Sequence, residues 1–188
     1  MNNMFQIRLH GRGGQGVVSA AEMLSVAAFL EGKHAQAFPS FGSERMGAPV
    51  MAFCRMDDKE IRLREPVMEP NALIIQDPTL LTQHAIFDGL PEDGFILLNS
   101  TRSYAELGIE EEVARLPEGH VCGIDASKLA MKYVGRPVPN AALLGGFAAV
   151  TRQLTLESVV EAIMKKFPGK IGEANVQAAT DAYELVAA

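Results

Sequence analysis

Apolar and polar residues alternate at the start of the chain. Phe5, Ile7 and Leu9 are each followed by a polar residue, and this two-residue period predicts a half-buried strand over 4–10. Glycines come next. Residues 17–30 then form an apolar run with few charges, which predicts a helix with Gly32 suited to its C-cap.

Similar patterns continue through the chain. Strands are predicted at 34–38, 49–56, 72–76, 95–99 and, more weakly, 120–124, and a hairpin is predicted that pairs 60–64 with 49–56 across the polar turn 57–59. Helical patterns lie at 79–87, 105–115 and 126–133. The last 50 residues are mostly helical, over 140–152, 156–167 and 173–186.

Strands that alternate with helices predict an α/β fold. We expect a layered α/β/α domain with a mixed, mostly parallel sheet and a helical C-terminal third, and the hairpin is what would make the sheet mixed. The length of 188 residues suits a single domain over 1–188. The strand order does not follow from these patterns.

Composition excludes several function classes. The chain is 48% hydrophobic and 21% charged, which is typical of globular proteins rather than disordered ones. A formal net charge of −6 argues against a nucleic-acid or anionic-membrane partner. The first residues lack the pattern of a signal peptide, and no apolar run has the length of a membrane span. We therefore expect a cytoplasmic protein.

Metal and nucleophile chemistry have little support. Cys54 and Cys122 are too few for a disulfide scaffold and too isolated for a zinc or iron–sulfur site, so both are expected in the core. The four histidines have no metal-ligand spacing. No neighbouring motifs assemble a nucleophile, a base and an oxyanion hole. We expect neither catalytic residues nor metal ligands in this chain.

A glycine-rich segment between the first strand and the first helix carries the clearest chemical signal. Its G-x-G-x-x-G pattern consists of Gly11, Arg12, Gly13, Gly14, Gln15 and Gly16. Without Cβ atoms the backbone can approach a ligand closely, and the N–H groups and dipole of the helix start favour an anion. The segment therefore predicts a phosphate site. A turn that only permits tight strand–helix packing is the alternative.

The dinucleotide fingerprint is incomplete. It requires an acidic residue about 20 positions further on to hold the ribose, but residues 34–40 offer neither a carboxylate nor an arginine. NAD is therefore only weakly indicated. A Walker loop is excluded because Gly-Lys-Ser/Thr occurs nowhere.

A second unusual loop spans residues 38–49, with two prolines and two glycines. Loops held by a scaffold often carry binding residues. Ser43 could donate to an anion, Arg45 could clamp a phosphate or a partner's carboxylate, and Gly47 completes the candidate set. An ordinary solvated loop is the alternative.

Other polar residues have structural readings. Asp77 precedes Pro78 and is expected to form an Asx turn or helix cap, and Asn140 is expected to be an N-cap rather than a ligand. Arg62 and Arg64 share one face of the predicted hairpin strand. That face is either solvated or in contact with another subunit.

Several separated motifs, taken together in this order, resemble one family. They are GRGGQG, AFPSFGSERMGAPV, IRLREPV, ALIIQDPTLL and PNAALLGG, with Asn175 in the last helix. The chain resembles, from about residue 5 to 186, the gamma subunit of 2-oxoacid:ferredoxin oxidoreductases, and is most similar to that of pyruvate:ferredoxin oxidoreductase.

The resemblance implies a role in a larger enzyme of anaerobic metabolism. Such an enzyme uses thiamine diphosphate to decarboxylate a 2-oxoacid, passes electrons through 4Fe-4S clusters to ferredoxin, and releases acyl-CoA. Thiamine and the clusters would belong to the partner alpha, beta and delta subunits. The present chain would be inactive alone. It would help to bind coenzyme A, with Gly13 to Gly16, Ser43 and Arg45 around the phosphates.

The sequence departs from the family at one point. Single-chain enzymes have two lysines where this chain has Glu44 and Arg45, and Glu44 would repel phosphate, so we expect it to face Arg45 or a partner subunit. Three alternatives remain. The chain could serve another 2-oxoacid (2-oxoisovalerate, 2-oxoglutarate or indolepyruvate), be a free-standing dinucleotide-dependent dehydrogenase, or be an assembly module with a structural glycine turn.

Overall fold

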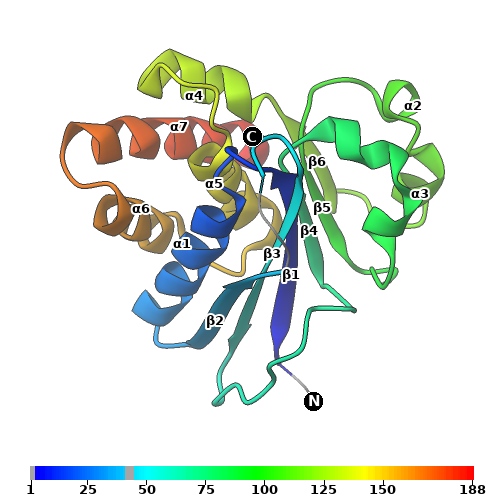
Figure 1. Cartoon of the computed structure of the whole chain (residues 1–188), viewed down its shortest axis with the longest axis horizontal. Helices are drawn as coiled ribbons and strands as arrows, with labels where there is room; N and C mark the ends of the chain where they lie inside the picture. Colours follow the sequence, from blue (N-terminus) through cyan, green and yellow to red (C-terminus); the bar gives the residue numbers. More distant parts are fainter. Residues whose placement is uncertain (1–2, 41–44) are drawn as a thin grey trace.

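Six strands form one sheet at the centre of the molecule (Figure 1). The computed structural model describes residues 3–40 and 45–188. The strand order is β2-β3-β1-β4-β5-β6. The strands are β1 (Phe5–Arg12), β2 (His34–Pro39), β3 (Pro49–Asp57), β4 (Ala72–Ile75), β5 (Phe95–Asn99) and β6 (Val121–Ile124). β3 is antiparallel to both β1 and β2, whereas β1, β4, β5 and β6 pair in parallel, which confirms the mixed, mostly parallel sheet.

Helices cover both faces of the sheet. They are α1 (Val17–Leu30), α2 (Tyr104–Leu107), α3 (Glu110–Ala114), α4 (Ala126–Val134), α5 (Asn140–Thr151), α6 (Leu156–Lys166) and α7 (Lys170–Ala187), with the 3₁₀ helices η1 (Pro78–Thr82) and η2 (His84–Phe87). The bounds predicted for α1 are confirmed, as is the helical C-terminal third. The two helices predicted at 79–87 and 105–115 are each two short pieces. Among the described residues, no helix has the length and apolar character that crossing a membrane requires.

The three-layer arrangement follows from the alternation of apolar side chains along the strands. In β4, Ala72 and Ile74 join a large core beneath α1, α5 and α7, while Leu73 and Ile75 join a smaller core with residues of η1 and η2. Figure 1 shows α1 and α4–α7 on one side of the sheet and α2 and α3 on the other. The predicted α/β/α layering is therefore confirmed.

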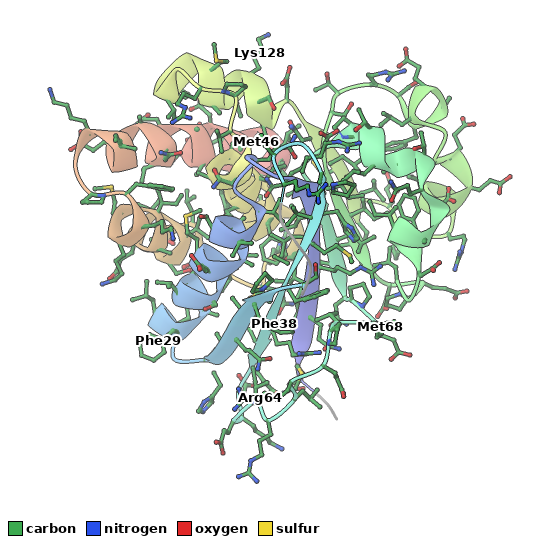
Figure 2. The ribbon with its side chains drawn as sticks, viewed as in Figure 1. Phe29, Phe38, Met46, Arg64, Met68 and Lys128 are labelled. Atoms are coloured by element: carbon green, nitrogen blue, oxygen red, sulfur yellow. The ribbon has the colours of Figure 1, made fainter. Side chains whose placement is uncertain are left out.

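The predicted hairpin at 53–64 is wrong. Residues 60–64 form no strand, and the segment instead lies against the β2-β3-β1 half of the sheet. Long side chains hold its carbonyl groups: Gln36 Nε2 donates to Leu63 O at 2.8 Å, and Arg55 Nη2 donates to Pro66 O at 3.3 Å. Figure 2 shows Arg64 and Met68 along this segment. Arg62 and Arg64 therefore share no strand face, and the sheet is mixed because of β3 alone.

Two arginines on this face are buried, although β1 was expected to expose its polar side. Arg8 is 6% exposed and Arg55 is 1% exposed. Arg55 donates to Gln6 Oε1 at 2.8 Å and lies over the Phe38 ring. Burial lowers the pKa of both guanidinium groups, and Asp88 and Glu65 partly oppose this shift. Hydrogen bonds make the buried charges tolerable. Their acceptors are carbonyls of the 60–71 segment and of residues 86 and 88, together with side chains of β1 and β2.

A carboxylate joins the end of α1 to the start of α6. Glu31 Oε1 accepts hydrogen bonds from Thr155 N at 2.7 Å and from Ser158 Oγ at 2.6 Å. Thr155 is also the N-cap of α6, where it accepts from Ser158 N. Burial by itself raises the pKa of Glu31, but the hydrogen bonds from Ser158 and Thr155, together with Lys33, lower it on balance.

This lowered pKa predicts a pH-dependent contribution to stability. The contribution is present above the ordinary value of 4.5 and is lost as the pH falls through the folded-state value. Glu31→Gln should therefore lower the free energy of unfolding by about 1–2 kcal/mol at pH 7. The difference should shrink towards zero at pH 3 in urea titrations.

Glu22→Gln is the control, because Glu22 makes an exposed ion pair with Lys166 that contributes at most about 1 kcal/mol. Equal destabilisation by Glu31→Gln at both pH values would contradict the assignment.

Candidate functional site

The site lies at the carboxyl ends of the neighbouring strands β1 and β4, where the chain after each strand leaves towards a different face of the sheet. β1 leads to α1 beneath one face, and β4 leads to η1 and η2 on the other. In open α/β sheets ligands bind at such a switch point. The residues placed here are the glycine loop (residues 11–16) and the two residues that follow β4, Gln76 and Asp77.

The structure brings the two unusual loops of the sequence together. Gly13 N donates to Ala48 O at 2.9 Å, and Gly47 N donates to Gly13 O at 3.1 Å. A Cβ atom on Gly13 would lie 2.2 Å from Arg45 O, so this approach requires glycine. The side chains of Arg45 and Met46 are exposed beside the loop, and Figure 2 shows Met46 next to the start of α1.

Gln15 and Arg12 hold the loop in shape. Gln15 Oε1 accepts from Arg12 N at 2.8 Å, and Gln15 Nε2 donates to Asp77 Oδ2 at 2.9 Å. The Arg12 guanidinium lies 3.3 Å from Asp77 Oδ2 and donates to Thr79 Oγ1 and to Gly47 O. The hydrogen bonds of both side chains therefore fix the conformation of the loop.

Unsatisfied donors face outward at the start of α1. Gly16 is the N-cap, with φ of 71°, and no side chain caps the helix. The first N–H groups of a helix have no intrahelical partner. The N–H groups of Gly14 and Gly16 also have no backbone partner in the part of the chain that the structure describes. Gly13 N, by contrast, already donates to Ala48 O. The candidate donors to a phosphate are therefore the N–H groups of Gly14, Gly16 and the first turn of α1.

These donors open into a shallow pocket of about 250 Å³. The described residues that line it include no carboxylate and are Arg12, Gly13, Gly14, Gly16, Val17, Val18, Ser19 and Val50. Glycine N–H groups, a helix dipole and one cation suit an anion. The alternative, a glycine turn with a purely structural role, explains why residue 13 is glycine. It does not explain the N–H groups of Gly14 and Gly16 that line the pocket without a backbone partner among the described residues.

Asp77 is a helix cap as predicted, whereas Asn140 is not the predicted N-cap. Asp77 caps η1 by accepting from Thr79 N at 3.0 Å. Hydrogen bonds from Thr79 and Gln15, with Arg12 nearby, outweigh burial and lower the pKa of Asp77. The N-cap of α5 is Pro139, so the expectation for Asn140 was wrong. Its buried side chain instead donates to Gly16 O at 3.4 Å, because α5 starts directly beside the loop.

Sequence reasoning missed Gln76. It is 1% exposed, and its Nε2 donates to Gln15 O at 2.7 Å. Gln76 Oε1 is buried without a partner among the described residues, a cost that structures concentrate at functional sites. The available signal was a polar residue directly after the apolar run of β4.

Ser43, with its neighbour Glu44, lies outside the described residues. Cys54 is a core residue, as predicted, and burial raises the pKa of its thiol to about 12. Cys122 is half-buried and packs against the large core, so its predicted core placement holds only in part. Within residues 3–40 and 45–188, no group of His, Cys, Asp and Glu is arranged to hold a metal ion.

Comparison with known proteins assigns the family. The family model described as pyruvate ferredoxin/flavodoxin oxidoreductase matches residues 6–185. The pyruvate synthase subunit PorC of Methanocaldococcus jannaschii is 47% identical over 96% of both chains. The chain therefore belongs to the pyruvate ferredoxin/flavodoxin oxidoreductase family, as its motifs predicted.

Two further relatives agree. The pyruvate/ketoisovalerate oxidoreductases common subunit gamma of Pyrococcus furiosus is 44% identical over 96% of both chains. The crystal structure of the pyruvate oxidoreductase subunit PORC of Thermotoga maritima matches with a TM-score of 0.81 and 36% identity, over 97% of this chain and 96% of that one. The resemblance to gamma-type subunits is thus confirmed in both sequence and fold.

The role of Gln15 predicts a local loss of order when its amide is removed. Gln15→Leu leaves Arg12 N without its acceptor and removes one of the two donors at Asp77 Oδ2, which should cost about 1–3 kcal/mol of unfolding free energy. Amide hydrogen exchange at Arg12 should accelerate. Gln153→Leu is the control, since Gln153 is remote from the loop. Unchanged protection of the Arg12 amide would refute the role.

Proposed function

We propose that this chain, acting as one unit over residues 1–188, is the gamma subunit of a CoA-acylating 2-oxoacid:ferredoxin oxidoreductase. The complex converts pyruvate to acetyl-CoA by oxidative decarboxylation. This chain contributes to coenzyme A binding and to assembly. The single observation that carries the proposal is that no side chain caps the start of α1. In this member of the family, that helix start lies beside the loop that carries the exposed Arg45.

The chemistry of the pocket fits the phosphates of coenzyme A. The N–H groups of Gly14, Gly16 and the first turn of α1 supply neutral donors. Arg45 does not line the pocket itself but is exposed beside the loop, from where it would supply a cation. Gly11, Gly13 and Gly47 shape the loop, and the family resemblance adds Ser43. Arg12 is largely neutralised by Asp77, so it contributes mainly through position.

The sheet order argues against a dinucleotide-dependent dehydrogenase. In the dinucleotide-binding fold the carboxylate that holds the ribose follows the strand next to β1. Here β3 occupies that place and runs antiparallel. The end of β2 is thereby two strands away from the glycine loop, about 10 Å, and it carries no carboxylate.

The remaining chemistry is assigned to partners. Thiamine diphosphate and the 4Fe-4S clusters belong to alpha, beta and delta subunits of a cytoplasmic complex, and ferredoxin docks on that complex. Neither nucleic acid nor a membrane is involved. Relatives named as a common gamma subunit of pyruvate and ketoisovalerate oxidoreductases support selection of the oxoacid on other chains. The chain's own task is to bind coenzyme A and orient its thiol.

Arg45→Glu should raise the apparent KM of the assembled complex for coenzyme A by about 5- to 150-fold, because a charge-assisted contact worth about 1–3 kcal/mol becomes repulsive. The apparent KM for the oxoacid should change much less. Lys59→Glu alters the net charge equally but lies exposed beyond the far end of β3, so it serves as the control. If Arg45→Glu and Lys59→Glu had the same apparent KM for coenzyme A, Arg45 would instead be assigned to a subunit interface.

Assembly can be tested independently of coenzyme A. The chain purified from its native source should carry thiamine- and cluster-bearing subunits at one-to-one stoichiometry, measured by quantitative mass spectrometry of the intact complex. Recovery of the chain alone at native levels would refute the proposed assembly.

A further inference from the structure

A second pocket opens at the same edge of the sheet, on the side of η1 and η2. Its volume is about 240 Å³, and apart from His10, Ser40 and Gln83 the described residues that line it are apolar: Pro49, Val50, Met51, Leu80, Ala85 and Ile86. We call it the His10 pocket. Val50 lines both this pocket and the one at the glycine loop, so the two are neighbours.

One ring nitrogen of His10, Nδ1, has no partner among the residues that the structure describes. His10 is 7% exposed, and its Nε2 accepts a hydrogen bond from Arg8 Nε at 3.0 Å. A guanidinium only donates, so Nε2 carries no proton and the proton of the neutral ring sits on Nδ1. No described residue accepts from Nδ1.

The donor is permanent and uncharged. Burial and the charge of Arg8 lower the pKa of His10 to about 3, so the ring remains neutral near pH 7. Arg8 is itself held by Ile86 O at 2.9 Å and Asp88 O at 2.8 Å, which keeps the imidazole in one orientation. A neutral donor in an apolar pocket selects a neutral acceptor, such as an amide carbonyl, over an anion.

The size of the pocket limits its occupant. Sites that enclose a whole drug-sized ligand have volumes of roughly 300–1,000 Å³, so this pocket takes one slender part of a larger molecule. The pocket at the glycine loop is its neighbour, because Val50 lines both. A ligand with phosphate at one end and an amide-bearing arm fits both.

We infer that the His10 pocket holds the amide-bearing pantetheine arm of coenzyme A and that His10 Nδ1–H donates to an amide carbonyl of that arm. The inference rests on the proposed function, since it requires coenzyme A to be the ligand of the glycine loop. His10 is then a binding and positioning residue that directs the thiol away from the phosphate site.

Two substitutions in the assembled complex separate this role from support of Arg8. His10→Gln keeps an acceptor for Arg8 Nε but loses the donor at the Nδ1 position. His10→Asn keeps a donor near Nδ1 but loses the acceptor for Arg8. A binding role therefore predicts damage in the glutamine variant and rescue in the asparagine variant, and a purely structural role predicts the reverse.

The readouts are the apparent KM for coenzyme A and the inhibition constant of N-ethylpantothenamide, which has the arm's amides without thiol or phosphate. His10→Gln should raise both by the same factor, about 2- to 10-fold, while the KM for the oxoacid changes much less. His10→Asn should change them by less than about twofold. Ala85→Leu, which reduces the pocket without touching the imidazole, should also raise both, so the test stands if an imidazole variant fails to fold.

Wild-type constants in both His10→Gln and Ala85→Leu would overturn the inference. So would weaker assembly in either variant if the complex that remains assembled has wild-type coenzyme A constants, because that result would assign the pocket to a partner subunit. Arg45→Glu keeps the two proposals apart, because it should raise the KM for coenzyme A but leave N-ethylpantothenamide inhibition unchanged. If Arg45→Glu alters coenzyme A binding while His10→Gln does not, only the present inference fails.

Discussion

The site depends on the hydrogen bonds of one side-chain amide. Gln15 accepts from the backbone of its own loop and donates to Asp77 after the neighbouring strand. Asp77 in turn holds Arg12 and the first turn of η1. Because these bonds satisfy the polar groups of the loop internally, the donors left over are those at the start of α1. The anion-binding surface that we propose is thus made of the donors that the loop itself does not use.

Buried charge organises the other face of the sheet. Arg8 and Arg55 are desolvated, which is costly unless every donor is used. Their bonds to backbone carbonyls hold the 60–71 segment and η2 against β1 and β3. The same packing buries His10 and fixes its proton on Nδ1. The rigidity of the sheet face and the chemistry of the His10 pocket therefore have a common cause, namely the placement of guanidinium groups on the polar side of β1 and β3.

Local patterns were reliable where a single element decides the outcome. The strand β1, the helix α1 and the glycine loop between them appear as predicted, and Asp77 caps η1 as its position before Pro78 indicated. Predictions failed where a distant partner decides. The carbonyls of the 60–64 segment are held by Gln36 and Arg55 rather than by a strand ladder, and Asn140 turns to the glycine loop, 124 residues away in sequence.

The sequence by itself determined the class of fold and the family, and it predicted a phosphate site at the glycine loop, because periodicity, glycine spacing and motif order are local properties. Only the tertiary structure decided which donors remain available. It placed β3 between β2 and β1, brought residues 45–48 onto Gly13, and buried Gln76 and His10 at one edge of the sheet. Those outcomes depend on which strands are neighbours, and strand order is set by packing across the whole chain rather than by any segment of it.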